Sequence, residues 1–108
     1  MKVARPATPA KLRTTAPRQI VIDLKGLRNR QAMLERIATA LGFPAHFGHN
    51  LDALYDCLTD LKIAKSKPLE VVLHGVGTGT AVQSVAAVFD DAAEWFAERG
   101  LTFTVQRT

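Results

Sequence analysis

The chain has 108 residues, 47% of them hydrophobic, so it is long enough for about one globular domain with a single core. It lacks any apolar run of the ~20 residues that a membrane-spanning helix needs, and its single cysteine, Cys57, excludes an intramolecular disulfide and a cysteine-based metal cluster. The net charge of +4 is unevenly placed: residues 1–18 carry five basic and no acidic side chains, whereas residues 19–108 carry nine basic and ten acidic ones. The composition therefore predicts a basic arm joined to a nearly neutral domain.

Residues 1–18 contain three prolines and no apolar periodicity, which predicts a flexible basic arm outside a folded domain of residues 19–108. The segment lacks the apolar block of a secretory signal, and its prolines disfavour the amphipathic helix of a mitochondrial targeting peptide, so we expect a cytoplasmic protein. We interpret the arm as a solvated tail. The alternative is weak contact with nucleic acid through its cations, although it has no aromatic residue to stack on a base.

The first half of the domain predicts one strand and two helices. Residues 19–24 (QIVIDL) are β-branched and apolar and predict a strand. The apolar spacing that follows predicts a helix that Asn29 caps and Gly42 ends. A second helix is expected from about Asn50 to Leu61, with Asn50 as its N-cap.

The second half predicts a strand, a long helix and a final strand. Residues 69–75 (LEVVLHG) predict the strand, Thr80 is expected to cap the helix and Gly100 to end it, and residues 101–107 alternate as a strand does. The resulting order is β-α-α-β-α-β. Strands joined through helices usually lie parallel, so we expect an α/β fold with a small three-stranded parallel sheet and helices packed on it.

An acidic stripe marks the second predicted helix, where Asp52, Asp56 and Asp60 recur every four residues. Like charges at this spacing repel by a few tenths of a kcal/mol per pair. No Lys or Arg lies one turn from Asp56, and Tyr55 and Phe47 add aromatic rings nearby. Unpaired charges beside aromatic rings are typical of a protein-binding surface. Solvent-facing decoration is the plainer alternative, and a paired-carboxylate hydrolase would need a cleft that the sequence does not reveal.

Three other features receive plainer interpretations. His46, His49 and Asp52 could hold zinc, but no fourth ligand is evident, so we interpret the histidines as surface residues and expect no metal and no cofactor. The glycines of residues 75–79 are spaced G-x-G-x-G, which is not a nucleotide-binding pattern, and they indicate a plain loop. Cys57 lies in an apolar helical pattern and is interpreted as a small core residue.

Residues 47–59, which read FGHNLDALYDCLT, resemble the hallmark of the barstar family, the intracellular inhibitors of small secreted ribonucleases of the barnase kind. That hallmark runs aromatic-Gly-x-Asn-Leu-Asp-Ala-Leu-Trp-Asp-Cys-Leu-Thr. The resemblance covers about residues 19–108 and implies the same order of elements. It also implies a protein that inhibits a ribonuclease, has no catalytic residues of its own and needs no cofactor.

The resemblance also implies roles for particular residues. In the family, the second helix and the loop before it plug the ribonuclease active site, and aspartates replace the RNA phosphates. By matching position, Asp56 would be the main phosphate mimic and Asp52 a second acidic contact, while Gly48 and Asn50 would shape the loop. A carboxylate on the last long helix assists, and Asp91 occupies that place here. The predicted partner-binding residues are His46, Phe47, Gly48, His49, Asn50, Asp52, Tyr55, Asp56 and Asp91.

Three of these positions depart from the family pattern. His46 stands for an aromatic anchor, His49 for an acidic residue and Tyr55 for a tryptophan. The domain is also nearly neutral, so electrostatic steering toward a basic partner is weaker. We therefore predict an antitoxin or immunity-type inhibitor of a barnase-like or other basic ribonuclease, either extracellular or a toxin. The alternative is an RNA-associated module that binds through the basic arm of residues 1–18.

Overall fold

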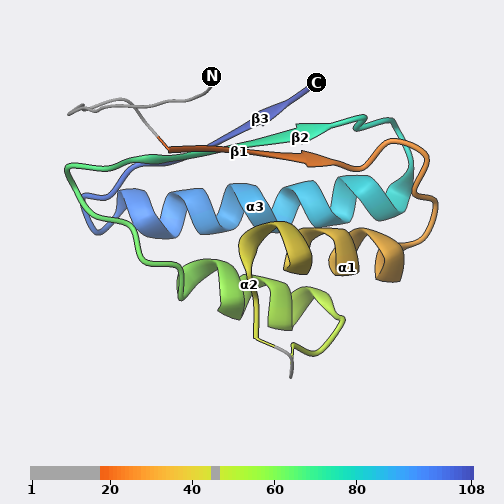
Figure 1. The fold of residues 1–108 in the computed structure, drawn as a ribbon, viewed down its shortest axis with the longest axis horizontal. Coiled ribbons are helices and arrows are strands. Elements are labelled where there is room, and N and C mark those ends of the chain that lie inside the picture. The colour runs from red at the N-terminus through yellow and green to blue at the C-terminus, as the bar shows by residue number, and fades with distance from the viewer. Residues whose placement is uncertain (1–17, 45–46) are drawn as a thin grey trace, which may run out of the picture.

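The computed structural model describes residues 18–44 and 47–108, so residues 1–17 of the predicted arm lie outside the described part, as do Ala45 and His46. Six elements follow one another in the order that the sequence predicts (Figure 1). They are β1 (Arg18–Asp23), α1 (Arg30–Leu41), α2 (Leu51–Thr59), β2 (Leu69–His74), α3 (Thr80–Ala97) and β3 (Phe103–Arg107). The predicted β-α-α-β-α-β order is confirmed.

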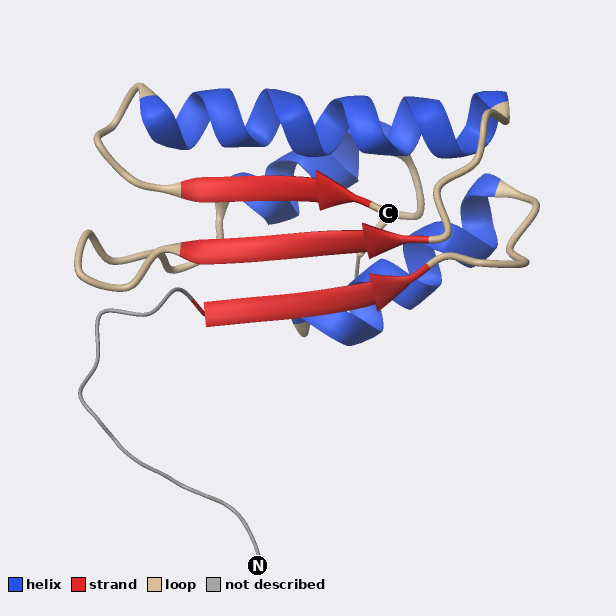
Figure 2. Cartoon of the chain, turned by 90° about the horizontal axis from the view of Figure 1, so that it is seen from above, coloured by secondary structure: helices blue, strands red, loops and turns tan. Residues whose placement is uncertain are grey.

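The three strands form one parallel sheet with β2 in the centre, in the order β1-β2-β3. Figure 2 shows the strands pointing the same way, and Figure 1 shows the helices gathered on one side of the sheet. The register places Val71 of β2 between Ile20 of β1 and Val105 of β3. The predicted α/β fold is therefore confirmed, and the strand order, which the sequence did not indicate, is now defined.

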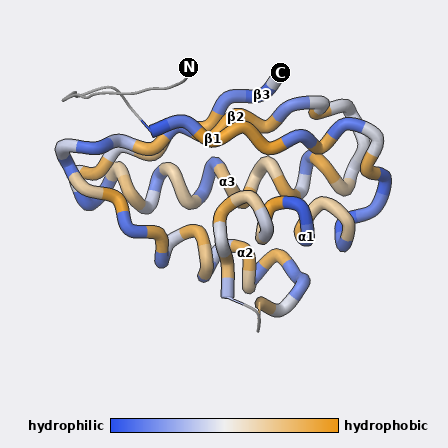
Figure 3. Tube along the Cα trace, viewed as in Figure 1, coloured by the Kyte–Doolittle hydropathy of each residue, from blue (hydrophilic) through white to orange (hydrophobic). Residues whose placement is uncertain are grey.

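The core lies between the sheet and the helices. Alternate residues of β2, namely Leu69, Val71 and Leu73, are buried in it. Figure 3 shows hydrophobic residues along the strands and the helices. Its largest fully buried side chains are Phe89, Phe96, Ile22, Leu24, Leu34, Ile37, Leu54, Leu58, Leu69, Leu73, Val71 and Val85. Burying each of them is worth roughly 1.5–3 kcal/mol relative to exposure. The core therefore fixes α2 through two of its leucines and leaves the other face of that helix free.

Three of the predicted helix ends are observed, at Asn29, Gly42 and Asn50, while α3 ends at Ala97, three residues before the Gly100 that was expected to end it. The Asn29 and Asn50 side chains each accept a hydrogen bond of 2.8 Å from the backbone N–H three residues later, and Gly42 ends α1 with a φ of 70°. The prediction that Thr80 caps α3 is wrong. Thr80 is already helical, and Gly79 is the N-cap residue without a side-chain cap. α3 therefore begins at Thr80, one residue earlier than it would if the Thr80 hydroxyl were its cap.

Gly75, directly after β2, lies against the chain that follows β1. Its φ is +81°, and an added Cβ would lie 2.6 Å from the backbone of Lys25. Only glycine combines that conformation with so close an approach.

Within the described residues, no helix is both long and apolar enough to span a membrane.

Candidate protein-binding site

α2 is held against the rest of the domain by one face and presents the other to solvent. Leu54 and Leu58, one turn apart, are fully buried at 0% exposure, and α2 packs on α3. Asp52 and Asp56, also one turn apart, are exposed. The same spacing that fixes the helix therefore turns its carboxylates outward.

A depression of about 540 Å³ lies between the exposed face of α2 and α3. Its lining residues are Leu51, Asp52, Tyr55, Asp56, Val88 and Asp91. Carboxylates from two helices thus surround an apolar floor made by Leu51 and Val88. The sequence predicted the three aspartates and the tyrosine but missed these two floor residues. The sequence places Val88 on the same helix face as Asp91, three residues before it, but no local signal indicates that α2 packs beside that face.

The carboxylates of this depression have no cationic neighbour within ion-pair distance among the residues that the structure describes. Asp90 differs from its sequence neighbour Asp91, because its carboxylate pairs with Arg107 of β3 at 2.5 Å. The other ion pair joins two adjacent residues at the end of α3. The described part of the chain therefore leaves Asp56 and Asp91 available to an external cation.

The loop before α2 is ordered around Phe47 and Asn50. The Phe47 ring is 6% exposed and lies between Phe43 and His49, with ring centroids 5.2 Å and 5.1 Å away. The backbone N–H of Asn50 donates to the carbonyl of Gly48 at 2.7 Å, while its side chain caps α2. Asn50 therefore fixes the turn from loop to helix, and Phe47 supports the exposed His49 ring from below.

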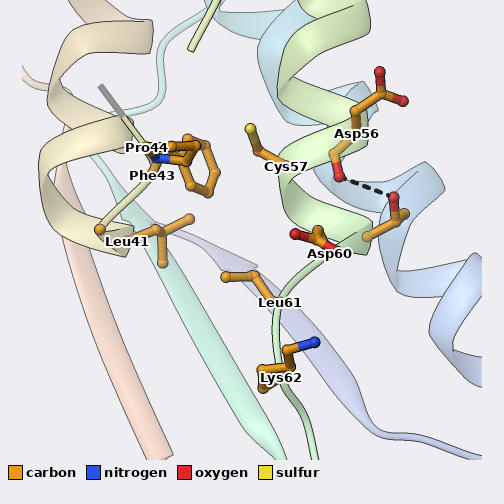
Figure 4. Close-up of a pocket in the computed structure, with 10 residues that line it drawn as sticks. Leu41, Phe43, Pro44, Asp56, Cys57, Asp60, Leu61 and Lys62 are labelled. Atoms are coloured by element: carbon orange, nitrogen blue, oxygen red, sulfur yellow. Dashed lines mark hydrogen bonds between the residues drawn. The ribbon is translucent and has the colours of Figure 1, made fainter. Parts of the chain in front are cut away.

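A second depression, of about 470 Å³, lies on the other side of Asp56, between α2 and the end of α1 (Figure 4). In Figure 4 the Asp56 side chain projects away from Phe43, whereas Cys57 points toward it. Burial raises the pKa of the Cys57 thiol, and the charges of Asp56 and Asp60 raise it further. A raised pKa disfavours the thiolate, so Cys57 is suited to packing rather than to nucleophilic chemistry. Asp56 stands on the ridge between the two depressions.

The metal site considered from the sequence is only partly described. His46, one of its three candidate ligands, lies outside the described residues. Among the residues that the structure does describe, no group of three His, Cys, Asp or Glu side chains is placed to hold a metal ion. His49, in the loop before α2, and Asp52, in the first turn of α2, are both exposed.

Comparison with known proteins agrees with this geometry. A family model described as "Barstar (barnase inhibitor)" matches residues 18–107. A Bacillus subtilis (strain 168) protein named "Putative ribonuclease inhibitor YrdF" is 43% identical over 42 residues, which are 39% of this chain. The match spans 46% of that relative, so about half of its length is covered. The family match extends across all six elements, and the chain belongs to the barstar family.

Proposed function

We propose that this protein is a stoichiometric, non-catalytic inhibitor of a barnase-like or other basic ribonuclease, either extracellular or a toxin. The family description refers to an inhibitor of barnase, and the Bacillus subtilis relative is named as a ribonuclease inhibitor. The single observation that carries the proposal is the group of exposed carboxylates around one depression on α2 and α3. This group presents a polyanion on a rigid scaffold.

The proposed mechanism is imitation of the RNA backbone. A ribonuclease must collect cationic side chains in its active site to hold the phosphates of its substrate. Asp56, at the ridge, would enter that site as the main phosphate mimic, with Asp52 and Asp91 as second contacts. None of these carboxylates carries a bond that the enzyme can cleave. Because helices hold them in place before binding, little conformational entropy is lost on association.

The residues around the carboxylates would fit the partner's surface. Tyr55 lines the depression as a partly buried ring, the type of residue that often anchors an interface. His49 would contact the partner directly, and Phe47, which is buried, would act by holding His49 in place. Gly48 and Asn50 would set the loop, and His46 is proposed as a contact on the basis of the family motif alone.

An inhibitor of this kind would protect the RNA of the cell that makes the ribonuclease, which is an antitoxin or immunity role in the cytoplasm. The single cysteine, Cys57, is free, as is usual in a reducing compartment. Residues 19–108, together with Arg18 at the start of β1, would form the inhibitory domain, and the rest of the basic segment of residues 1–18 would lie outside it.

Calorimetry of the full chain with barnase tests the proposal. We expect a one-to-one complex that Asp56→Asn weakens by roughly 2–5 kcal/mol, or about 30- to 5,000-fold, because the substitution leaves partner cations buried and unpaired. That range draws on barnase–barstar itself, a complex of this family, and is applied here to Asp56. Asp23→Asn removes the same charge at the far end of β1, where the amide can still accept the hydrogen bond from the Lys25 backbone. Equal binding by the Asp56 and Asp23 variants would contradict the proposal.

A further inference from the structure

The face that carries the carboxylates extends beyond them along α3. Trp95 and Arg99 follow Asp91 at intervals of four residues, so the three side chains share one side of the helix and its terminal turn. Trp95 is partly buried, and the Arg99 guanidinium lies 3.7 Å from the centre of its ring. Arg99 also donates a hydrogen bond of 2.9 Å to the Trp95 carbonyl. The guanidinium is therefore held in a defined place at the end of α3.

Cations also gather where α2 ends. Lys62 follows the acidic stripe and lines the same depression as Asp56 and Asp60 (Figure 4). Lys65 reaches the end of α3, because its Cε lies 3.6 Å from the position that a Cβ on Gly100 would take. Both lysines are exposed. We call Lys62, Lys65 and Arg99 the basic rim.

The cations of the basic rim lie at the end of the molecule where both helices finish. α2 and α3 both run from right to left in Figure 1, and the loop after α2 rises at the same end of the molecule where α3 finishes. Along α2 the chain therefore passes from Asp52, Asp56 and Asp60 to Lys62, whereas on α3 two exposed carboxylates, Glu94 and Glu98, lie between Asp91 and Arg99. Glu98 is the carboxylate paired with Arg99, but the pair is exposed and its atoms are 3.8 Å apart, so it is weak and leaves the guanidinium available.

We propose, on the basis of the ribonuclease-inhibitor function above, that the partner is a ribonuclease whose cationic cleft is bordered by carboxylates, and that the basic rim binds those carboxylates. Charges of one sign facing each other across an interface weaken association, so a nuclease whose border is cationic is rejected. Arg99 on Trp95 presents the fork of donors that matches a carboxylate. The aspartates thus recognise a ribonuclease active site, and the basic rim selects among ribonucleases.

A display library of catalytically inactive barnase, randomised at the residues that border its active-site cleft, tests the proposal. The library is selected in parallel on three forms of the full chain: the wild type, the rim variant Lys62→Gln/Lys65→Gln/Arg99→Gln, and a control variant. The control, Lys25→Gln/Arg28→Gln/Arg30→Gln, removes the same charge from exposed residues in the β1–α1 connection and at the first position of α1, at the opposite end of the molecule from the end of α3 (Figure 1). Thermal unfolding verifies that all three forms are folded.

We expect the wild type and the control to enrich Asp and Glu at the border at least about threefold over the rim variant, a modest fold-change for the loss of three favourable charges. Equal enrichment by all three forms would overturn the proposal. Each selected binder is also tested on Asp56→Asn. Binders that need Asp56 but show no enrichment of Asp and Glu would refute only the proposed role of the basic rim. A lack of binders that need Asp56 would refute the inhibitor function as well. Salt-dependent binding of a labelled single-stranded RNA that the rim variant alone loses would assign the rim to nucleic acid and overturn the proposal.

Discussion

Replacing Asp56 with asparagine is expected to stabilise the free protein while it weakens binding. Asp56 lies one turn from Asp52 and one turn from Asp60, and it has no cation within ion-pair distance among the described residues. A carboxylate kept there for a partner repels its neighbours when the partner is absent. Asparagine has nearly the same shape and removes only the charge.

The size of the gain follows from the spacing. Each like-charge pair at i,i+4 costs roughly 0.2–0.5 kcal/mol, so relieving two pairs gives about 0.4–1 kcal/mol. For a domain of about 100 residues, this raises the unfolding midpoint by roughly 2–8 °C. Asp52→Asn relieves only one pair and also loses a favourable interaction of about 0.3–1 kcal/mol with the amino end of α2, so it is expected to give no gain.

Urea and thermal unfolding of both variants, followed by circular dichroism at low salt and in 1 M NaCl, measures these differences. The gain from Asp56→Asn should shrink at high salt, because the screening length falls to about 3 Å. Loss of stability in Asp56→Asn, or a gain that salt leaves unchanged, would refute the electrostatic reasoning. If Asp52→Asn raised the free energy of unfolding as much as Asp56→Asn does, the number of like-charged neighbours and the distance from the amino end of α2 would not determine the effect of the charge.

Three further predictions concern the scaffold. Gly75→Ala is expected to destabilise the fold by more than about 1 kcal/mol in urea unfolding, because it adds a clash to a left-handed backbone, whereas Gly77→Ala meets open space and is expected to change stability by less than about 0.5 kcal/mol. Asn50→Ala removes the cap of α2 and is expected to cost about 1 kcal/mol in the same assay, and an unchanged midpoint would contradict the capping role. Iodoacetamide is expected to alkylate Cys57 faster in Asp56→Asn than in the wild type at pH 8, since losing that charge lowers the pKa of the thiol, and an equal rate would exclude this electrostatic coupling.

Local signals in the sequence explain why so much of the fold was predictable. Asn29, Gly42 and Asn50 each act on the backbone within four residues, and each prediction is confirmed. The prediction that Thr80 caps α3 is wrong because a threonine that follows a glycine can be either the N-cap of a helix or its first residue. The sequence alone does not distinguish these two positions. The strand order depends on how the connections cross the sheet, which no local pattern encodes.

The candidate site was predictable in its residues but not in its shape. The spacing of Asp52 and Asp56 placed them on one face of a helix, as observed. The depression between α2 and α3 could not be predicted, because Leu51 and Val88 come together in its floor only through the packing of the two helices. The same holds for the choice between Asp90 and Asp91, since the ion pair that occupies Asp90 joins it to a strand seventeen residues later.

The most direct test of the central claim is the titration of barnase with the full chain while hydrolysis of a fluorogenic RNA is followed. If α2 fills the active site, activity falls to zero at one equivalent, and a non-hydrolysable oligonucleotide slows the association in proportion to its occupancy of the enzyme. A chain that binds barnase equally well in the presence of saturating oligonucleotide, or that leaves the bound enzyme active, would contradict the claim that these aspartates take the place of RNA phosphates.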